Sequence, residues 1–116
     1  MREIKFRAWD TKSESMEYEI AIGKGYGEDS YILFLGLGET FIIDDDIVKI
    51  MQYTGLKDKN NVEIFEYMEI DNTYEVSFLN GSYVLTNISN GDIILLSNYM
   101  ENNNGKVKIT REYTKV

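Results

Sequence analysis

The stretch Met51–Ile70, MQYTGLKDKNNVEIFEYMEI, decides how this chain folds. It leaves an apolar run at Gly55, crosses a polar connection at residues 56–61 and enters an alternating run at Val62. Gly55 can adopt positive φ without a Cβ clash, and the short Asp and Asn side chains of the connection can bond their own backbone. We therefore predict strand, turn and strand, with Leu56 packing back onto the sheet from the base of the loop.

The N-terminal residues 2–9, REIKFRAW, alternate in the manner of a half-buried strand. The predicted apolar face holds Ile4, Phe6 and Ala8, and the opposite face holds Glu3, Lys5, Arg7 and Trp9. A turn at residues 10–15 and a second alternating run at Met16–Ile22 predict an antiparallel hairpin. Trp9, on the polar face, either packs under a loop or lies in a partner surface, and we favour the loop because Trp is rarely left exposed.

The segment that follows Thr73 gives the clearest local pattern in the chain. Two alternating runs are joined by Asn80-Gly81, a dipeptide that fits a type I′ turn. A two-residue loop fixes the register, so we predict that Phe78 pairs with Tyr83 and that Val76 pairs with Leu85 on one face.

Further strands are predicted at Tyr31–Leu37, at Ile93–Leu96 and at residues 106–113, where the last suits a closing or edge strand. Residues 46–53 fit a helix by spacing and a strand by β-branched content. We therefore predict a mainly β protein with seven or eight short strands, a small antiparallel barrel or strongly bent sheet and at most a short helix. We expect one domain over residues 1–116, with a hairpin portion at 1–50 and a barrel portion at 51–116.

The composition restricts the function. The 116 residues include neither Cys nor His, which removes thiolate chemistry and the commonest general base, so we expect no enzyme and no cofactor. A formal net charge of −8 opposes general binding to nucleic acid. Because Met1 leads directly into charged residues and no apolar run spans a bilayer, we expect a cytoplasmic protein with neither a secretory signal nor a membrane segment.

Two local motifs suggest ligands but carry little specificity. The glycines of GKGYG at residues 23–27 are followed by an apolar run rather than by a helix start, so a flexible connection is the better interpretation than a phosphate loop. Asp44, Asp45 and Asp46 could hold a hard cation, but adjacent side chains point in different directions. The triplet also lacks the spacing of a calcium loop, so an acidic first helical turn or a solvated bend is the better interpretation.

Two stretches resemble the signatures of the YopX family of small phage and prophage proteins. They are MREIKFRAWD at the N-terminus and QYTGLKDKNNVEIFE at residues 52–66. Asn61 stands where that family usually has Gly, and Tyr67 and Met68 stand where it usually has Gly-Asp. The resemblance implies a C-terminal barrel of the SH3-like roll kind, an N-terminal hairpin, and a phage-derived protein that self-associates. It implies no activity.

The leading functional hypothesis is a non-enzymatic accessory protein that works through protein contacts, including a homo-oligomer. The candidate binding surface consists of Lys5, Arg7, Trp9, Leu56, Lys57 and Lys59. The alternative is a small barrel that binds nucleic acid through the same basic residues together with Phe6 and Trp9. A third hypothesis is a metal-assisted hydrolase that uses the carboxylates of Asp44, Asp46, Asp58 and Glu63.

Overall fold

The computed structural model describes residues 3–18, 20–24, 31–34, 40–42 and 48–113. The chain divides into two compact units, one built on Ile4–Gln52 and the other on Tyr53–Tyr113. The boundary lies inside strand β6, Val48–Lys57, two residues beyond the division expected from the sequence. These are the N-terminal unit and the C-terminal unit.

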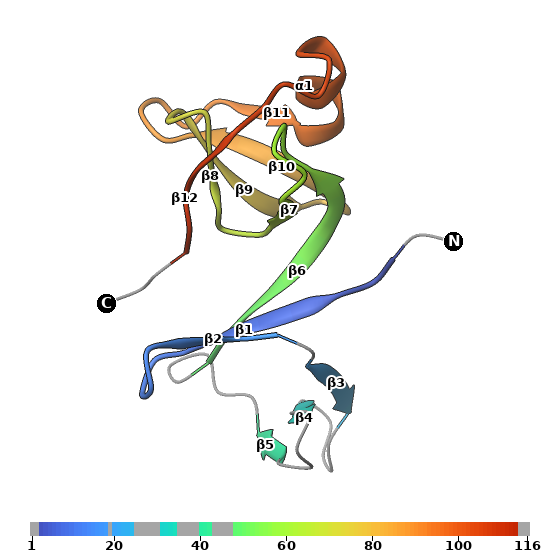
Figure 1. The fold of residues 1–116 in the computed structure, drawn as a ribbon, viewed down its shortest axis with the longest axis vertical. Helices are drawn as coiled ribbons and strands as arrows, with labels where there is room; N and C mark the ends of the chain where they lie inside the picture. Colours follow the sequence, from blue (N-terminus) through green and yellow to red (C-terminus); the bar gives the residue numbers. More distant parts are fainter. Residues whose placement is uncertain (1–2, 19, 25–30, 35–39, 43–47, 114–116) are drawn as a thin grey trace. The chain divides into compact units, whose positions relative to one another are not determined.

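The N-terminal unit consists of two antiparallel sheets. Its strands are β1 (Phe6–Asp10), β2 (Ser15–Glu17), β3 (Ala21–Lys24), β4 (Tyr31–Phe34), β5 (Thr40–Ile42) and the first half of β6. One sheet has the order β2-β1-β6 and the other the order β3-β4-β5 (Figure 1). The mainly β character predicted for this half is therefore confirmed.

The predicted N-terminal hairpin is present as β1 and β2. Oδ1 of Asp10 accepts hydrogen bonds from the backbone nitrogens of Lys12 at 2.9 Å and Ser13 at 3.4 Å, and Glu14 adopts a left-handed φ of 53°. Short polar side chains thus form the turn, and they set Trp9 opposite Met16 in the ladder.

The second strand of that hairpin is shorter than predicted. The run Met16–Ile22 divides between β2, which pairs with β1, and β3, which pairs with β4. The ambiguous segment 46–53 is strand from Val48 onward. The rest of that segment, the remainder of the predicted strand Tyr31–Leu37, most of GKGYG and the triplet Asp44–Asp46 lie outside the described residues.

The assignment of faces on β1 was wrong. Arg7 and Trp9, predicted on the polar face, are 1% and 9% exposed, whereas Ile4, predicted on the apolar face, is 61% exposed. Ile4 precedes the strand, and Ala8 is buried together with Arg7 and Trp9, so side chains on both faces of β1 are covered. Ala8 and Val48 form a small core with the partly buried Ile20, Ile22 and Ile50.

The C-terminal unit is a curled antiparallel half-barrel, as predicted (Figure 1). Its elements after β6 are β7 (Glu63–Phe65), β8 (Glu69–Ile70), β9 (Tyr74–Leu79), β10 (Ser82–Asn87), β11 (Ile93–Leu95), α1 (Leu96–Asn102) and β12 (Ile109–Arg111). β7 pairs with β6, and the other strands form a sheet with the order β11-β10-β9-β8-β12. The buried apolar residues of this unit are Tyr53, Ile64, Phe65, Met68, Ile70, Val76, Val84, Leu85, Leu96 and Val107.

The hairpin at Asn80-Gly81 forms with the predicted register. Asn80 and Gly81 have φ values of 51° and 83°, as a type I′ turn requires, and Phe78 lies opposite Tyr83. The rings of that pair stack edge to face with centroids 5.0 Å apart. Two residues further from the turn, Val76 pairs with Leu85, and both are fully buried.

The number of strands and the place of the helix differ from the prediction. The described residues contain twelve strands rather than seven or eight, because several short strands were merged or missed. The single short helix lies at Leu96–Asn102, where the sequence has no capping side chain before it and no acidic residue in its first turn. Of the two positions predicted for the last strand, closing or edge, the structure shows the edge, since β12 ends the five-stranded sheet.

Candidate functional site

The six residues proposed as a binding surface divide between the two units. Lys5, Arg7 and Trp9 belong to the N-terminal unit, and Leu56, Lys57 and Lys59 belong to the C-terminal unit. The structure therefore describes the six residues as two groups, three in each unit.

In the N-terminal group, Arg7 contributes to packing. Its Nη1 donates a hydrogen bond of 3.4 Å to the hydroxyl of Tyr18, and its Nη2 lies 3.6 Å from Sδ of Met51. Trp9 is buried as well. Of this group only Lys5, which is partly exposed, lies at the surface of the unit.

The C-terminal group surrounds a loop that Asp58 organises. Oδ1 of this buried carboxylate accepts hydrogen bonds from the backbone nitrogens of Asn60 and Val62, each at 2.9 Å. The Thr54 hydroxyl donates to the carbonyl of Ile64 at 2.8 Å and accepts from the Leu56 nitrogen at 3.2 Å. The sequence TGLKDKN therefore forms a rigid connection, because its polar side chains satisfy its own backbone.

The side chains of this loop differ in their exposure to solvent. Lys57 and Lys59 are exposed, whereas Leu56 is half-buried at the end of β6. Asn61 adopts a left-handed φ of 65°, which Asn tolerates better than most residues. The loop consequently offers two cations on a fixed backbone.

The carboxylates proposed for metal-assisted hydrolysis are not gathered by the described part of the structure. Asp44 and Asp46 lie outside it, and Asp58 is engaged by backbone N–H groups. Within residues 48–113 and the other described ranges, no three acidic side chains are grouped in a way that could hold a metal ion.

A surface that the sequence did not indicate lies on the outward face of the five-stranded sheet. Cross-strand partners point to the same face, so the register places Leu79 of β9 and Ile93 and Leu95 of β11 on one face, on which Val84 of β10 is itself buried. Leu79, Ile93 and Leu95 are 44%, 52% and 43% exposed. Ile88, in the turn before β11, is 55% exposed. Ile88, Ile93 and Leu95 thus form an exposed apolar group at the β11 end of the sheet, whereas Leu79 lies on β9, two strands away.

The backbone of β11 can be oriented from the same register. In a hairpin with a two-residue loop, the residues that flank the loop form a hydrogen-bonded pair, and such pairs then alternate along the ladder. Val84 and Thr86 therefore bond toward β9, while Leu85 bonds toward its β11 partner Ile94. It follows that the peptide groups of Ile93 and Leu95 face away from β10. We call these outward groups the β11 edge.

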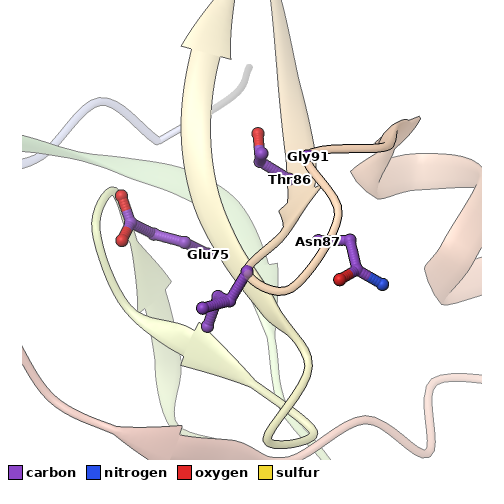
Figure 2. A pocket seen from close by; sticks show the side chains of 5 residues that line it. Glu75, Thr86, Asn87 and Gly91 are labelled. Atoms are coloured by element: carbon purple, nitrogen blue, oxygen red, sulfur yellow. The ribbon is translucent and has the colours of Figure 1, made fainter.

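A shallow hollow of about 370 Å³ lies beside the turn that leads into β11. Figure 2 shows Glu75 coming from β9, Thr86 and Asn87 from the end of β10, and Gly91 in the following turn. Asn87 shapes this turn, because its Oδ1 accepts hydrogen bonds from the backbone nitrogens of residues 89 and 90 at 2.9 and 3.2 Å. The hollow brings an acidic side chain to the end of the sheet at which the apolar surface lies.

The helix that follows β11 is attached through Tyr99. Its hydroxyl donates a hydrogen bond of 2.7 Å to Oδ2 of Asp71, and its ring packs edge to face against Tyr74. Burial and, secondly, the bond to Asp71 raise the pKa of Tyr99 to about 12. Tyr99 is therefore neutral at physiological pH and has a structural role.

In the part of the chain that the structure describes, no helix combines the length and apolar character needed to traverse a bilayer.

Comparison with known proteins places the chain in a family. The family model described as YopX protein matches residues 5–109, whereas no curated protein matches the chain. Among solved structures, the crystal structure of protein EF1440 from Enterococcus faecalis is similar, with a TM-score of 0.64 and 22% sequence identity. That match covers 97% of this chain and 94% of the other, and at this identity the likeness concerns the fold. Since the family model spans most of the chain, this protein belongs to the YopX family.

Proposed function

We propose that this protein is a non-catalytic accessory protein of a phage or prophage, located in the cytoplasm, that acts by binding another protein. The observation that carries the proposal is the group of exposed apolar side chains on and beside β11, Ile88, Ile93 and Leu95. Exposed apolar side chains are ordinary when scattered, but a group at a sheet edge is typical of interaction sites. The absence of His and Cys from the sequence supports binding rather than catalysis.

The nucleic-acid alternative has weaker support. Of its proposed contacts, Arg7 and Trp9 are buried within the N-terminal unit. Lys57 and Lys59 are exposed, but the chain as a whole carries a formal charge of −8. A phosphate backbone demands a concentration of cations that these lysines alone do not supply.

Affinity capture with a mass measurement tests the proposal. The tagged chain is incubated with lysate of a host that carries the phage, retained proteins are identified by mass spectrometry, and the mass of the purified complex is measured by light scattering. We expect one protein to be retained in stoichiometric amount. A chain that retains no protein and remains monomeric at every salt concentration would contradict the proposal.

A matched pair of variants assigns the captured protein to the β11 surface. The double variant Ile93→Thr, Leu95→Thr removes exposed apolar groups and keeps residues that favour strands. The control Val62→Thr removes an apolar group that is 50% exposed elsewhere in the same unit. We expect the double variant to lose the partner and the control to keep it; equal retention by both would exclude this surface.

A further inference from the structure

We propose that the β11 edge binds an extended peptide from a partner, with apolar side chains opposite Ile93 and Leu95 and a Lys or Arg opposite Asp92. The peptide would add a strand to the five-stranded sheet. This inference rests on the proposed function, because it names the chemical class of partner for the same surface.

The first support is the set of backbone groups that the edge offers. The N–H and C=O of Ile93 and the N–H of Leu95 face away from β10, whereas the C=O of Leu95 begins the hydrogen bonding of α1. No turn or loop hydrogen bond found among the described residues engages the three outward groups. The Ile93 N–H, the Ile93 C=O and the Leu95 N–H therefore have the spacing with which an added strand can form hydrogen bonds.

The second support is the arrangement of side chains along β11. Ile93 and Leu95 alternate with the less exposed Ile94, so both exposed side chains lie on one face of the sheet. Side chains directly opposite on neighbouring strands lie about 5 Å apart and interact. Apolar residues at alternate positions of the peptide would consequently cover both side chains.

Charge favours a basic peptide over a second copy of this chain. Asp92 immediately precedes β11 and is exposed, and the structure shows no partner for its carboxylate in the described ranges. Glu75 in the hollow adds negative charge at the same end of β11. Two copies would each bring a net charge of −8, whereas a Lys or Arg beside Asp92 would offset it.

Pairing of β11 with β11 of a second copy would also leave part of the hydrogen-bonding groups of the β11 edge without a partner. An antiparallel pair centred on Ile94 would set Ile93 of each copy against Leu95 of the other. Because the Leu95 carbonyl belongs to α1, only the bonds from Leu95 N–H to the Ile93 carbonyl would form. A peptide has no such restriction, so it can satisfy all three outward groups.

The probe is a pair of capped nine-residue peptides with Gly-Ser flanks and the central sequences Lys-Val-Thr-Val and Val-Thr-Val-Lys, which cover both strand directions. Binding is followed by amide chemical shifts of the full-length chain at peptide concentrations up to millimolar. We expect saturable shifts at Ile93 and Leu95 with one of the two peptides. Shifts that are absent, or that occur elsewhere in the chain, would overturn the proposal.

Replacement of Leu95 separates the backbone contact from the side-chain contact. Leu95 has φ −70°, which proline adopts, and its N–H points outward, so Leu95→Pro removes one hydrogen-bond donor without breaking the sheet. Leu95→Ala also loses the side chain but keeps the donor. We expect the Pro variant to bind roughly tenfold more weakly than the Ala variant; equal affinities would overturn the proposal.

N-methylated peptides test the same backbone hydrogen bonds without any change to the protein. N-methylation of the peptide amides that face β11 should abolish the shifts, and methylation of the alternate amides should not. Replacing the peptide Lys by Glu, or Asp92 by Asn, should weaken binding roughly threefold to tenfold at low salt and less at high salt. Insensitivity to both changes would overturn the basic specificity.

Two further outcomes distinguish the sources of failure. If shifts at Ile93 and Leu95 appear on raising the protein concentration alone and disappear in Leu95→Pro, the occupant is a second copy and the peptide proposal is overturned. If the lysate partner is captured equally by Leu95→Pro and Leu95→Ala, the edge inference fails while the protein-binding function stands. If the unmodified chain captures nothing, the proposed function itself fails.

Discussion

The hydroxyl of Tyr99 lies 2.7 Å from Oδ2 of Asp71, and this hydrogen bond ties α1 to the turn between β8 and β9. The other oxygen, Oδ1, accepts a bond of 2.9 Å from the backbone nitrogen of Lys108, which leads into β12. One carboxylate thus holds the helix and the last strand. Because a helix of seven residues without a side-chain cap is marginal by itself, such tertiary contacts decide whether it forms.

Tyr99→Phe should lower the free energy of unfolding by about 1–2 kcal/mol, because it removes a hydrogen bond to a charged acceptor and keeps the ring. Urea denaturation followed by circular dichroism measures the change. Tyr113→Phe is the control, since the structure shows a ring contact with Tyr67 but no hydrogen bond of the Tyr113 hydroxyl in the described part of the chain. Equal stability of Tyr99→Phe and the unmodified protein would contradict this role.

The same tyrosine predicts an alkaline weakening of the fold. Burial, followed by the bond to Asp71, raises the pKa of Tyr99 from 10.0 to about 12, so between these values the folded state binds more protons than the unfolded state. Its contribution is therefore complete below pH 10 and is lost as the pH rises toward 12. Urea midpoints should fall more steeply over this range for the unmodified protein than for Tyr99→Phe. If the urea midpoints of both proteins fell equally with pH, the raised pKa of Tyr99 would be contradicted.

Asp58→Ala should destabilise the protein by about 2–3 kcal/mol, because two backbone N–H groups of the loop lose a charged acceptor. Asp58→Asn keeps an acceptor oxygen and should cost about half as much. Thermal unfolding of both variants, with the exposed Asp92→Ala as control, measures the effect. The prediction fails if Asp58→Ala and Asp92→Ala melt together.

Gly81→Ala should cost about 1–2 kcal/mol of stability, because Gly81 has φ +83°, which an L side chain rarely adopts. No atom lies within 4 Å of the added Cβ, so the cost is conformational rather than steric. Asn80→Gly keeps the left-handed turn accessible and should change stability by less than about 1 kcal/mol. Denaturant titration of both variants checks this order, and the reverse order would refute the turn assignment.

The turns and the central hairpin could be predicted because their causes are local. The two-residue loop at Asn80-Gly81 sets the pairing of Val76 with Leu85, and the polar side chains after Gly55 form the loop that Asp58 organises. The burial of both faces of β1 could not be predicted, because Arg7 packs against residues that are distant in sequence, such as Met51.

The candidate site shows the same limit. The run at Ile93–Leu96 was identified as strand, but its position at the edge depends on the strand order of the whole sheet. Leu96 then begins a helix without a capping side chain, so no sequence signal marked the transition. The exposed apolar group therefore became visible only when the strands were placed beside one another.

The departures from the family pattern coincide with unusual backbone. Asn61 and Tyr67, the two positions at which the sequence resemblance predicts glycine, adopt φ values of 65° and 68°. Asn adopts this left-handed conformation readily, whereas in Tyr it costs conformational energy because of steric strain. The Tyr67 ring contacts Tyr113, with centroids 5.8 Å apart, and its N–H donates to the Val76 carbonyl at 2.7 Å. These contacts hold the ring and the backbone N–H of Tyr67 in place.

The Asn80-Gly81 turn is also a site at which the asparagine can deamidate. The glycine nitrogen of such a pair can attack the asparagine amide carbon, expel ammonia and close a succinimide, which water opens to aspartate or isoaspartate. Isoaspartate adds a methylene group to the main chain between the two residues that set the alignment of β9 with β10. Protein stored for a long time should therefore carry a growing fraction of molecules in which the β9–β10 hairpin is out of register.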